Sequence, residues 1–183
     1  MGSVPIRSAV VLVAGMVLVL GLPARADRSI MKDVNDVSGR LDIDELHHGH
    51  ADEGFKHRIS TFSPWPSRLL RRRATEFDLW MDLDADGSPD RVVYFGFRNK
   101  RLYGEMNTYE SDGDGAHLTV LGLVTVRRPN RSSLVAVIPK RWVKGEPYRW
   151  YVSSFFLGSD QESECGTEYA CQDKAPDSGW IKH

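Results

Sequence analysis

The chain has 183 residues, with 24 basic and 25 acidic side chains and a formal net charge of −1. Its hydrophobic fraction of 41% is typical of a globular protein and excludes a highly charged disordered chain. The near-neutral balance also gives no support to a polyanion-binding protein, so we expect no nucleic-acid partner.

The first residues have the order of a secretory signal peptide. Arg7 precedes an apolar run over residues 9–22, and the small residues Ala24 and Ala26 follow it in an A-x-A pattern. The alternative is a membrane anchor, but a span requires about 20 apolar residues and this run is shorter. The sequence therefore predicts cleavage after Ala26 and no membrane span in the product.

Cleavage would leave a single secreted, extracellular domain over residues 27–183. It removes two of the 24 basic residues, Arg7 and Arg25, and none of the 25 acidic ones, so the net charge falls to about −3. The two cysteines, Cys165 and Cys171, lie in a polar segment near the end of the chain. In an oxidising compartment we expect them to form a disulfide bond that pins the C-terminal tail, since their spacing differs from the C-x-x-C of redox pairs.

From Arg40 onward, short runs rich in β-branched and aromatic residues alternate with Gly, Asp, Asn and Pro clusters. This pattern predicts an all-β fold, an antiparallel two-sheet sandwich of jelly-roll or Ig-like type with about eight strands. Residues 139–146 predict one short helical turn, opened by Pro139 and closed by Gly145. The expected strands cover 40–48, 55–62, 75–83, 91–98, 101–109, 116–127, 132–138 and 148–157.

Alternation of apolar residues assigns a core face to several of these strands. Strand 116–127 differs, because apolar residues occupy both parities, which is the pattern of a strand covered on both sides or bent between sheets. We expect it to be central. The expected core residues are Phe77, Leu79, Met81, Val93, Phe95, Phe97, Leu134, Ala136 and Ile138.

The strongest local motif is D-x-D-x-D-G-x-x-D between two expected strands. Asp82, Asp84 and Asp86 would supply side-chain oxygens to calcium, Ser88 its carbonyl, and Asp90 a direct or water-mediated ligand. The twelfth position is valine and the flanks are strands, so an EF-hand is excluded. The motif instead resembles a single FG-GAP calcium loop of β-propeller blades. The alternative is that these residues form only a soluble turn.

Three histidines on one expected hairpin form a second candidate metal site. If residues 51–54 are the turn, His50 faces Phe55 and His48 faces His57, so that three imidazoles could bind zinc or copper. The alternative is structural hydrogen bonding, because Phe55 and Ile59 share the parity of His57 and place this side toward the core.

Across nearly the whole mature chain, the order of motifs resembles a set of uncharacterised exported bacterial β-sandwich proteins. Their sandwich is similar to DOMON and carbohydrate-binding jelly-roll modules, which implies an extracellular recognition module with no catalytic residues to carry over. The motifs are LDIDELHHGH, HRISTFSPW, the acidic hairpin, RRPNRSSLVAVIPKRW, YRWYVSSFF, the segment from Cys165 to Cys171, and APDSGW.

The sequence thus predicts a secreted, calcium-stabilised binding module for carbohydrate or a protein partner, without catalytic residues. Trp65 and Trp142 lie in Pro-bounded connections and are the candidate sugar-stacking rings, with core packing as the alternative. Two different classes of protein stay open. One is a hydrolase of envelope polysaccharide that uses carboxylates such as Glu76 and Glu105, and the other is the histidine-based metal binder.

Overall fold

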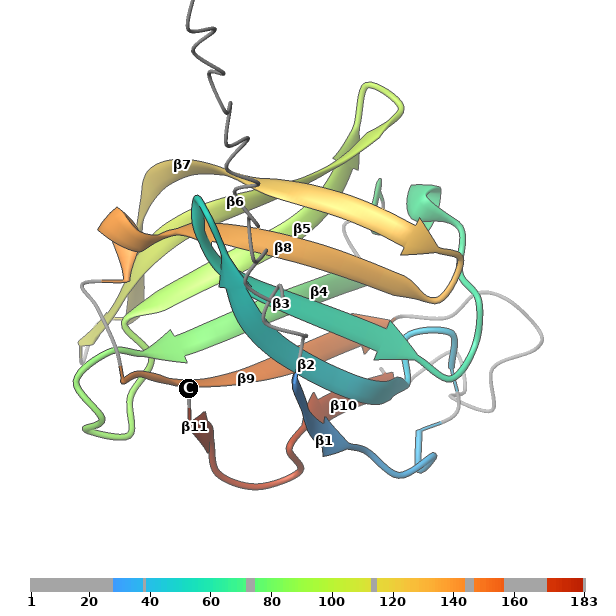
Figure 1. The fold of residues 1–183 in the computed structure, drawn as a ribbon, viewed down its shortest axis with the longest axis horizontal. Coiled ribbons are helices and arrows are strands. Elements are labelled where there is room, and N and C mark those ends of the chain that lie inside the picture. Colours follow the sequence, from blue (N-terminus) through green and yellow to red (C-terminus); the bar gives the residue numbers. More distant parts are fainter. Residues whose placement is uncertain are drawn as a thin grey trace, which may run out of the picture.

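The computed structural model describes residues 28–37, 39–71, 75–112, 115–143, 147–156 and 171–182, shown in Figure 1. The predicted signal peptide and Cys165 lie outside the described residues. The described part is all-β with antiparallel pairing and two short 3₁₀ helices. The elements are β1 (Arg28–Lys32), β2 (Ile43–Ala51), β3 (Gly54–Thr61), η1 (Ser67–Arg71), β4 (Thr75–Asp82), β5 (Arg91–Arg98), β6 (Arg101–Asp112), β7 (Gly115–Asn130), β8 (Ser133–Pro139), η2 (Lys140–Trp142), β9 (Arg149–Phe156), β10 (Cys171–Ala175) and β11 (Ile181–Lys182).

The eight strands expected from sequence are confirmed as β2 to β9, and the expected helical turn contains η2 after Pro139. Strands β1, β10 and β11 and helix η1 were not predicted. Each of them has five residues or fewer, too few for a periodic pattern to be recognised. None of the helices in the described ranges has the length and apolar character needed to cross a membrane.

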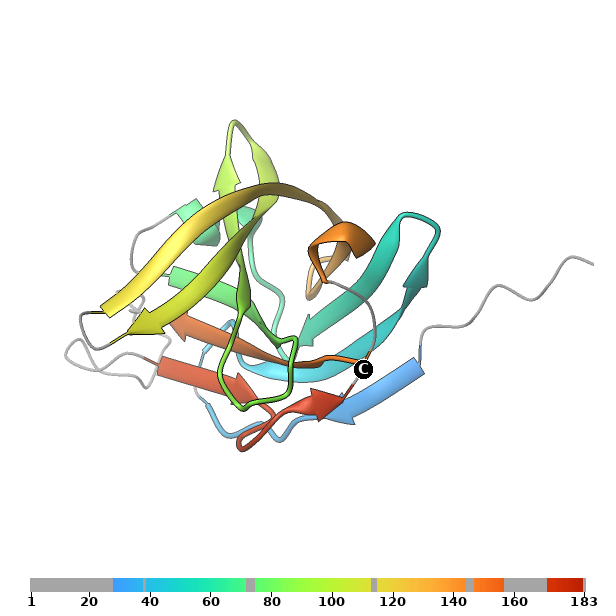
Figure 2. The same cartoon turned by 90° about the vertical axis from the view of Figure 1, so that its left-hand side faces the viewer.

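The expected two-sheet sandwich is replaced by one curled sheet. Its strand order is β1-β2-β3-β8-β7-β6-β5-β4-β9-β10, and β11 also pairs with β9. Figure 2 shows how the sheet turns back on itself, with the yellow strand β7 passing over the top. The curl lets one sheet bury its inner face against itself, as two separate sheets would do.

Strand β7 connects the two halves of the curled sheet. Up to Val124 it pairs with β6, and from Thr125 it pairs with β8. A bulge accompanies this bend, since Met106 pairs with Gly122 but Asn107 pairs with Val120. Gly122 has a φ of 146° and lies against the Trp142 ring, where a side chain would meet atoms at 3.1 Å. Of the two alternatives for this strand, covered on both sides or bent, the structure has the bend, and the expected central position is confirmed.

The core lies inside the curl, and alternation determines which residues reach it. Every residue of the expected core faces is buried except Phe97, which is half-buried. In β7, by contrast, Val120 and Leu123 are exposed. The alternative that both sides of this strand are covered was therefore wrong. In β4, Phe77, Leu79 and Met81 point into the core. Because side chains alternate along a strand, the even-numbered residues of β4 point to the outer face of the sheet.

Arg128, in the second half of β7, holds the connection between β3 and β4 against the sheet. Its guanidinium lies 3.9 Å from the centre of the Trp65 ring. It donates to Ser67 Oγ at 2.6 Å and to the carbonyls of Trp65, Asn130 and Arg131. One planar cation thus donates to three backbone carbonyls and one hydroxyl at once.

Replacing Arg128 by lysine should therefore lower the free energy of unfolding by about 1–3 kcal/mol, because a single ammonium cannot reach these acceptors together. Urea denaturation measures the change. The exposed neighbour Arg127 provides the matched control. We expect Arg127→Lys to alter stability by less than about 0.5 kcal/mol; equal effects of the two substitutions would contradict this role of Arg128.

Candidate functional site

The aspartate loop between β4 and β5 is held by its own carboxylates. Asp82 Oδ1 accepts from the Ala85 N–H at 2.7 Å, and Asp82 Oδ2 accepts from Gly87 at 3.0 Å. Asp84 Oδ1 accepts from Asp86, and Asp86 Oδ1 from the Ser88 N–H at 2.7 Å. Backbone amides therefore fix the direction of each carboxylate, as in successive Asx turns.

The loop brings together three of the predicted calcium ligands. Asp82, Asp84 and Asp86 each offer one oxygen, and these oxygens lie within 4.8 Å of one another. Asp90 is not in this group, because its Oδ2 accepts from the Leu83 N–H at 2.6 Å and closes the base of the loop. Ala85 and Gly87 have positive φ values of 65° and 98°, which allow the chain to turn around the carboxylates.

Next to this loop, five aromatic side chains form a connected layer on the outer face of the sheet. We call them the aromatic surface: Trp80, Tyr94, Tyr109, Tyr151 and Trp180, all half-buried. The Trp80 ring is stacked with Tyr151 at 6.0 Å between centroids and meets the edges of Tyr94 and Tyr109 at 6.2 and 5.2 Å. Trp180 extends the layer beyond Tyr151, at 4.8 Å.

Exposed aliphatic side chains continue the aromatic surface onto β7. Leu118 lies opposite Tyr109 in the ladder, and Val120 lies opposite Asn107. Residues opposite each other in a ladder project from the same face, so both extend the outer layer. Their exposed fractions are 48% and 59%. The outer face thus carries a broad apolar area, a feature that marks binding surfaces on soluble proteins.

Asp78 lies under the aromatic surface. It is only 5% exposed, its Oδ1 has no hydrogen-bond partner in the described structure, and Tyr94 and Ser153 flank it in the ladder. Burial raises the pKa of Asp78 to about 8, and the Glu76 carboxylate adds to the rise. Asp78 in turn contributes to the raised pKa of Tyr94, about 12, for which burial is the main cause. A carboxyl group with this pKa is mostly protonated at neutral pH.

The expectation of a hydrolase was based on different carboxylates. Glu76 is exposed and lies opposite Phe155, whereas Glu105 is half-buried and lies opposite Tyr94. Tyr94 thus separates Glu105 from Asp78 across the sheet. Asp78 was missed because its strand neighbours gave no sign that an outward-facing residue would be buried.

The histidine hairpin has the predicted register, with His48 opposite His57 and His50 opposite Phe55. The rings, however, pack among aromatic side chains. His57 is fully buried, with Nε2 at 2.8 Å from the Tyr148 hydroxyl and its ring 4.6 Å from Trp150. His48, His50 and His57 do not form one of the metal-ligand groups of the described residues, both of which consist of aspartates. The hydrogen bond with Tyr148 gives His57 a structural partner, and metal binding by the three histidines stays a prediction.

The two tryptophans expected to stack on a sugar have different environments. Trp65 is 2% exposed and packs between Arg128 and Phe77, so it offers no ring face to a ligand. That assignment was wrong, because the Pro-bounded connection folds back onto the core. Trp142 is half-buried, with Gly122 against one edge and Arg141 4.7 Å from the ring centre.

Two of the surface pockets in the described part of the chain lie away from the aromatic surface and are lined by charged side chains. One, of about 650 Å³, has His50, Lys56 and Arg127 in its lining, together with Asp52 and Glu53. The other, of about 520 Å³, is lined by Arg40, Arg68, Arg128 and Arg131 around Trp65. Since Arg128 is engaged in holding the loops, we interpret the second pocket as part of the packed connection.

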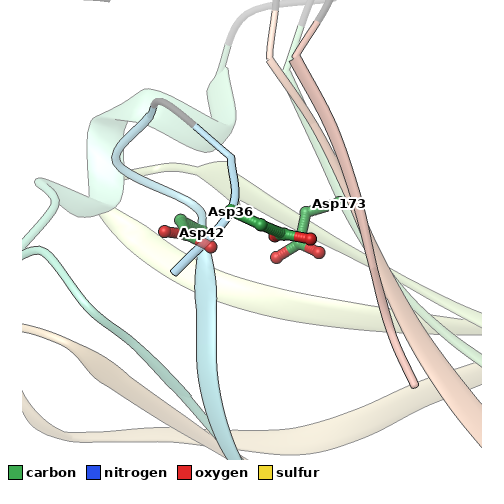
Figure 3. Close-up of side chains that lie close together, drawn as sticks. All are labelled: Asp36, Asp42 and Asp173. Atoms are coloured by element: carbon green, nitrogen blue, oxygen red, sulfur yellow. The ribbon is translucent and has the colours of Figure 1, made fainter. Parts of the chain in front are cut away.

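A second group of carboxylates lies where the two edges of the curled sheet approach each other. Asp36 and Asp42 come from the segment between β1 and β2, and Asp173 comes from β10, as Figure 3 shows. Sequence reasoning missed this group, because the three residues are separated by up to 137 positions and form no motif.

Comparison with known proteins adds no assignment: no family model, no curated protein and no solved structure matches the chain. The resemblance to exported bacterial β-sandwich proteins, DOMON modules and FG-GAP loops therefore stays a sequence-based expectation.

Asp78 leads to a prediction about pH. The pKa of Asp78 is about 8 in the folded protein and about 3.9 when unfolded. Between these values the folded state holds a proton that the unfolded state releases, so the free energy of unfolding should fall as pH rises, by up to about 1.4 kcal/mol per pH unit. Asp78→Asn should remove this contribution to the pH dependence and be more stable than the parent at pH 8.

Urea denaturation at pH 5 and pH 8 measures the effect. Glu110→Gln, at an exposed strand carboxylate, is the control and should keep the parental pH dependence. Parallel pH profiles for Asp78→Asn and the parent would show that Asp78 is already ionised in the folded protein.

Proposed function

We propose that this chain is an exported, non-catalytic recognition domain that binds carbohydrate through its aromatic surface and is stabilised by calcium in the loop Asp82–Asp90. The observation that carries the proposal is the connected layer of five aromatic rings on the outer face of the sheet. Export and extracellular location rest on the signal-peptide pattern of residues 1–26.

The aromatic surface has the chemistry that sugar binding requires. Sugar rings carry C–H groups on one face, which pack against tryptophan and tyrosine, while their hydroxyls need hydrogen bonds at the rim. Phenol rings supply both, since each tyrosine adds a hydroxyl to its ring, whereas the single indole N–H of Trp80 already donates to Ser153 Oγ at 2.9 Å and leaves Trp80 to act through its ring. Because the rings hold one another in place, a bound sugar would order few side chains, which limits the entropic cost of binding.

The aspartate loop Asp82–Asp90 is connected to the aromatic surface through β4 and β6. Asp82 follows Trp80 by two residues on the outer face of β4, and the Tyr109 N–H donates to the Asp90 carbonyl at 2.8 Å. An ion held by Asp82, Asp84 and Asp86 would stiffen the end of β4 and the contact with Tyr109. Calcium would therefore stabilise the recognition surface without contacting the ligand.

A matched pair of tyrosines on β6 tests the sugar-binding proposal. Tyr109 belongs to the aromatic surface, while Tyr103 lies on the same face of the strand but covers Gly96 and contacts Arg98. We expect Tyr109→Ala to weaken binding to a responsive polysaccharide by about tenfold, as loss of one stacking ring costs about 1–1.5 kcal/mol. Tyr103→Ala should leave binding within about twofold of the parent.

Affinity electrophoresis on envelope and plant polysaccharides, followed by calorimetry on any that retard the protein, provides the measurement. Circular dichroism of both variants checks that they are folded. Equal losses in the two variants, or no retardation by any polysaccharide, would contradict the proposed surface. Release of reducing ends during the same incubation would instead favour a hydrolase.

The loop variant Asp84→Asn/Asp86→Asn tests the calcium part of the proposal. Both side chains are exposed, so the substitution should leave the metal-free fold intact. In the parent, millimolar calcium should raise Tm by several degrees, since sites of this kind in extracellular modules bind in the 10⁻⁴–10⁻³ M range. The loop variant should lose a large part of that rise in a calorimetric melt.

Asp52→Asn, at an exposed carboxylate in the turn between β2 and β3, is the control for general charge effects. It should respond to calcium as the parent does. An unchanged calcium response in the loop variant would assign Asp82–Asp90 to a simple turn.

A further inference from the structure

The curled sheet has an open seam between its two edges, which side chains bridge. Strand β10 is one edge, and the segment leading into β2 lies beside it. Asp173 Oδ2 accepts from the Ile43 N–H at 2.6 Å, and Ser154 Oγ donates to the Leu41 carbonyl at 2.8 Å. These two bonds connect residues 130 and 113 positions apart, and they replace the backbone ladder that a closed barrel would have.

Three carboxylates gather at this seam. Asp36, Asp42 and Asp173 each offer an oxygen atom, and these atoms lie within 4.8 Å of one another, with the side chains grouped as in Figure 3. Oxygens bound to one calcium ion lie about 2.3–2.6 Å from it, so two of them can be at most about 5 Å apart. The spacing of the three oxygens therefore fits a shared hard cation without movement of the backbone.

Asp42 provides a second observation, independent of the grouping. It is 3% exposed, and its Oδ1 is buried with no hydrogen-bond partner in the described structure. Oδ2 of the neighbouring Asp33 is likewise buried and has no hydrogen-bond partner in the described structure. A buried carboxylate oxygen without a donor costs several kcal/mol unless a proton or a cation meets it. Nothing in the packing of the described residues supplies that partner.

The surrounding charges make the cost larger. The carboxylates of Asp173, Asp36, Asp33 and Asp44 all lie close enough to Asp42 to repel its negative charge. Asp173 also repels the carboxylate of Asp33. A divalent cation would offset this repulsion, because it supplies positive charge among the carboxylates.

We propose that Asp36, Asp42 and Asp173 bind one divalent cation of the calcium type, which links the two edges of the sheet across the seam. The site is separate from the loop Asp82–Asp90 and does not depend on the proposed sugar-binding function. Two ligands are buried and one is exposed, so the ion would face solvent on the Asp36 side and complete its coordination there with water.

Calorimetric titration of the full-length, EDTA-treated chain with calcium tests this site in the presence of the loop. The parent should bind two equivalents. The loop variant Asp84→Asn/Asp86→Asn should keep one, and its binding should raise Tm. Adding Asp36→Asn to the loop variant should weaken the remaining site by about tenfold or more, because an amide oxygen replaces a carboxylate.

Asp44→Asn in the same background is the matched control, since Asp44 lies close to Asp42 without belonging to the group. It should change affinity by less than about threefold, which separates ligation from a general charge effect. Asp36 is exposed, so its variant should fold, and circular dichroism confirms this.

If the loop variant binds no calcium and shows no change in Tm, the seam proposal is overturned while the loop site stands. Equal weakening by Asp36→Asn and Asp44→Asn would overturn it as well, because it would reduce the effect to net charge. Tighter binding of magnesium or manganese than of calcium would reject the assigned cation class. If the parent binds one equivalent and the loop variant still binds it, the proposed calcium site in the loop Asp82–Asp90 is wrong and the proposed seam site is supported.

Discussion

Strand β7 changes partner between Val124 and Thr125, from β6 on one side to β8 on the other. Because hydrogen bonding continues through this bend, the two halves of the domain are parts of one sheet, and their distance is set by backbone geometry as well as by packing. The bend requires Gly122 beneath Trp142 and the bulge beside it. The inner face, the core and the seam at the opposite side all follow from this turn.

The curl also limits where the protein can bind anything. The interior is filled by the core, so ligands must meet the outer face, the loops or the seam. The three chemically unusual regions occupy these places: the aromatic surface on the outer face, the carboxylates of Asp82–Asp86 in a loop, and those of Asp36, Asp42 and Asp173 at the seam. Two of them are acidic, and in each a backbone N–H orients a carboxylate: Gly87 donates to Asp82 in the loop, and Ile43 donates to Asp173 at the seam.

Sequence patterns predicted most of the fold, because most of its strands are long and carry one apolar face. The register of His48 with His57 followed from the length of a single turn. The patterns failed where the information is not local. Continuity of the sheet through β7 depends on which strands pair with it, and the short edge strands have no periodicity of their own. A two-sheet sandwich and a curled sheet have the same alternation of apolar and polar residues along their strands, so this alternation cannot distinguish the two folds.

The sites divide in the same way. Asp82, Asp84 and Asp86 were found because a loop of consecutive residues builds their geometry, whereas Asp78 and the seam group depend on burial and on contacts between distant segments. Trp65 was misplaced for a related reason: its exposure depends on Arg128, more than 60 positions away. Local patterns therefore identified ligand types better than they identified surfaces.

The seam has a consequence for how the chain reaches its native state. Ile43 in β2 donates to Asp173 in β10, so this side of the seam cannot form until the 130 positions between them are available. Contacts of such long sequence separation slow folding, since the entropy of a large loop must be lost before they form. During that interval both edges expose unpaired backbone groups, and the carboxylates beside them place like charges on any two chains that meet there. Mutual repulsion would then protect the unfinished sheet from pairing with another copy.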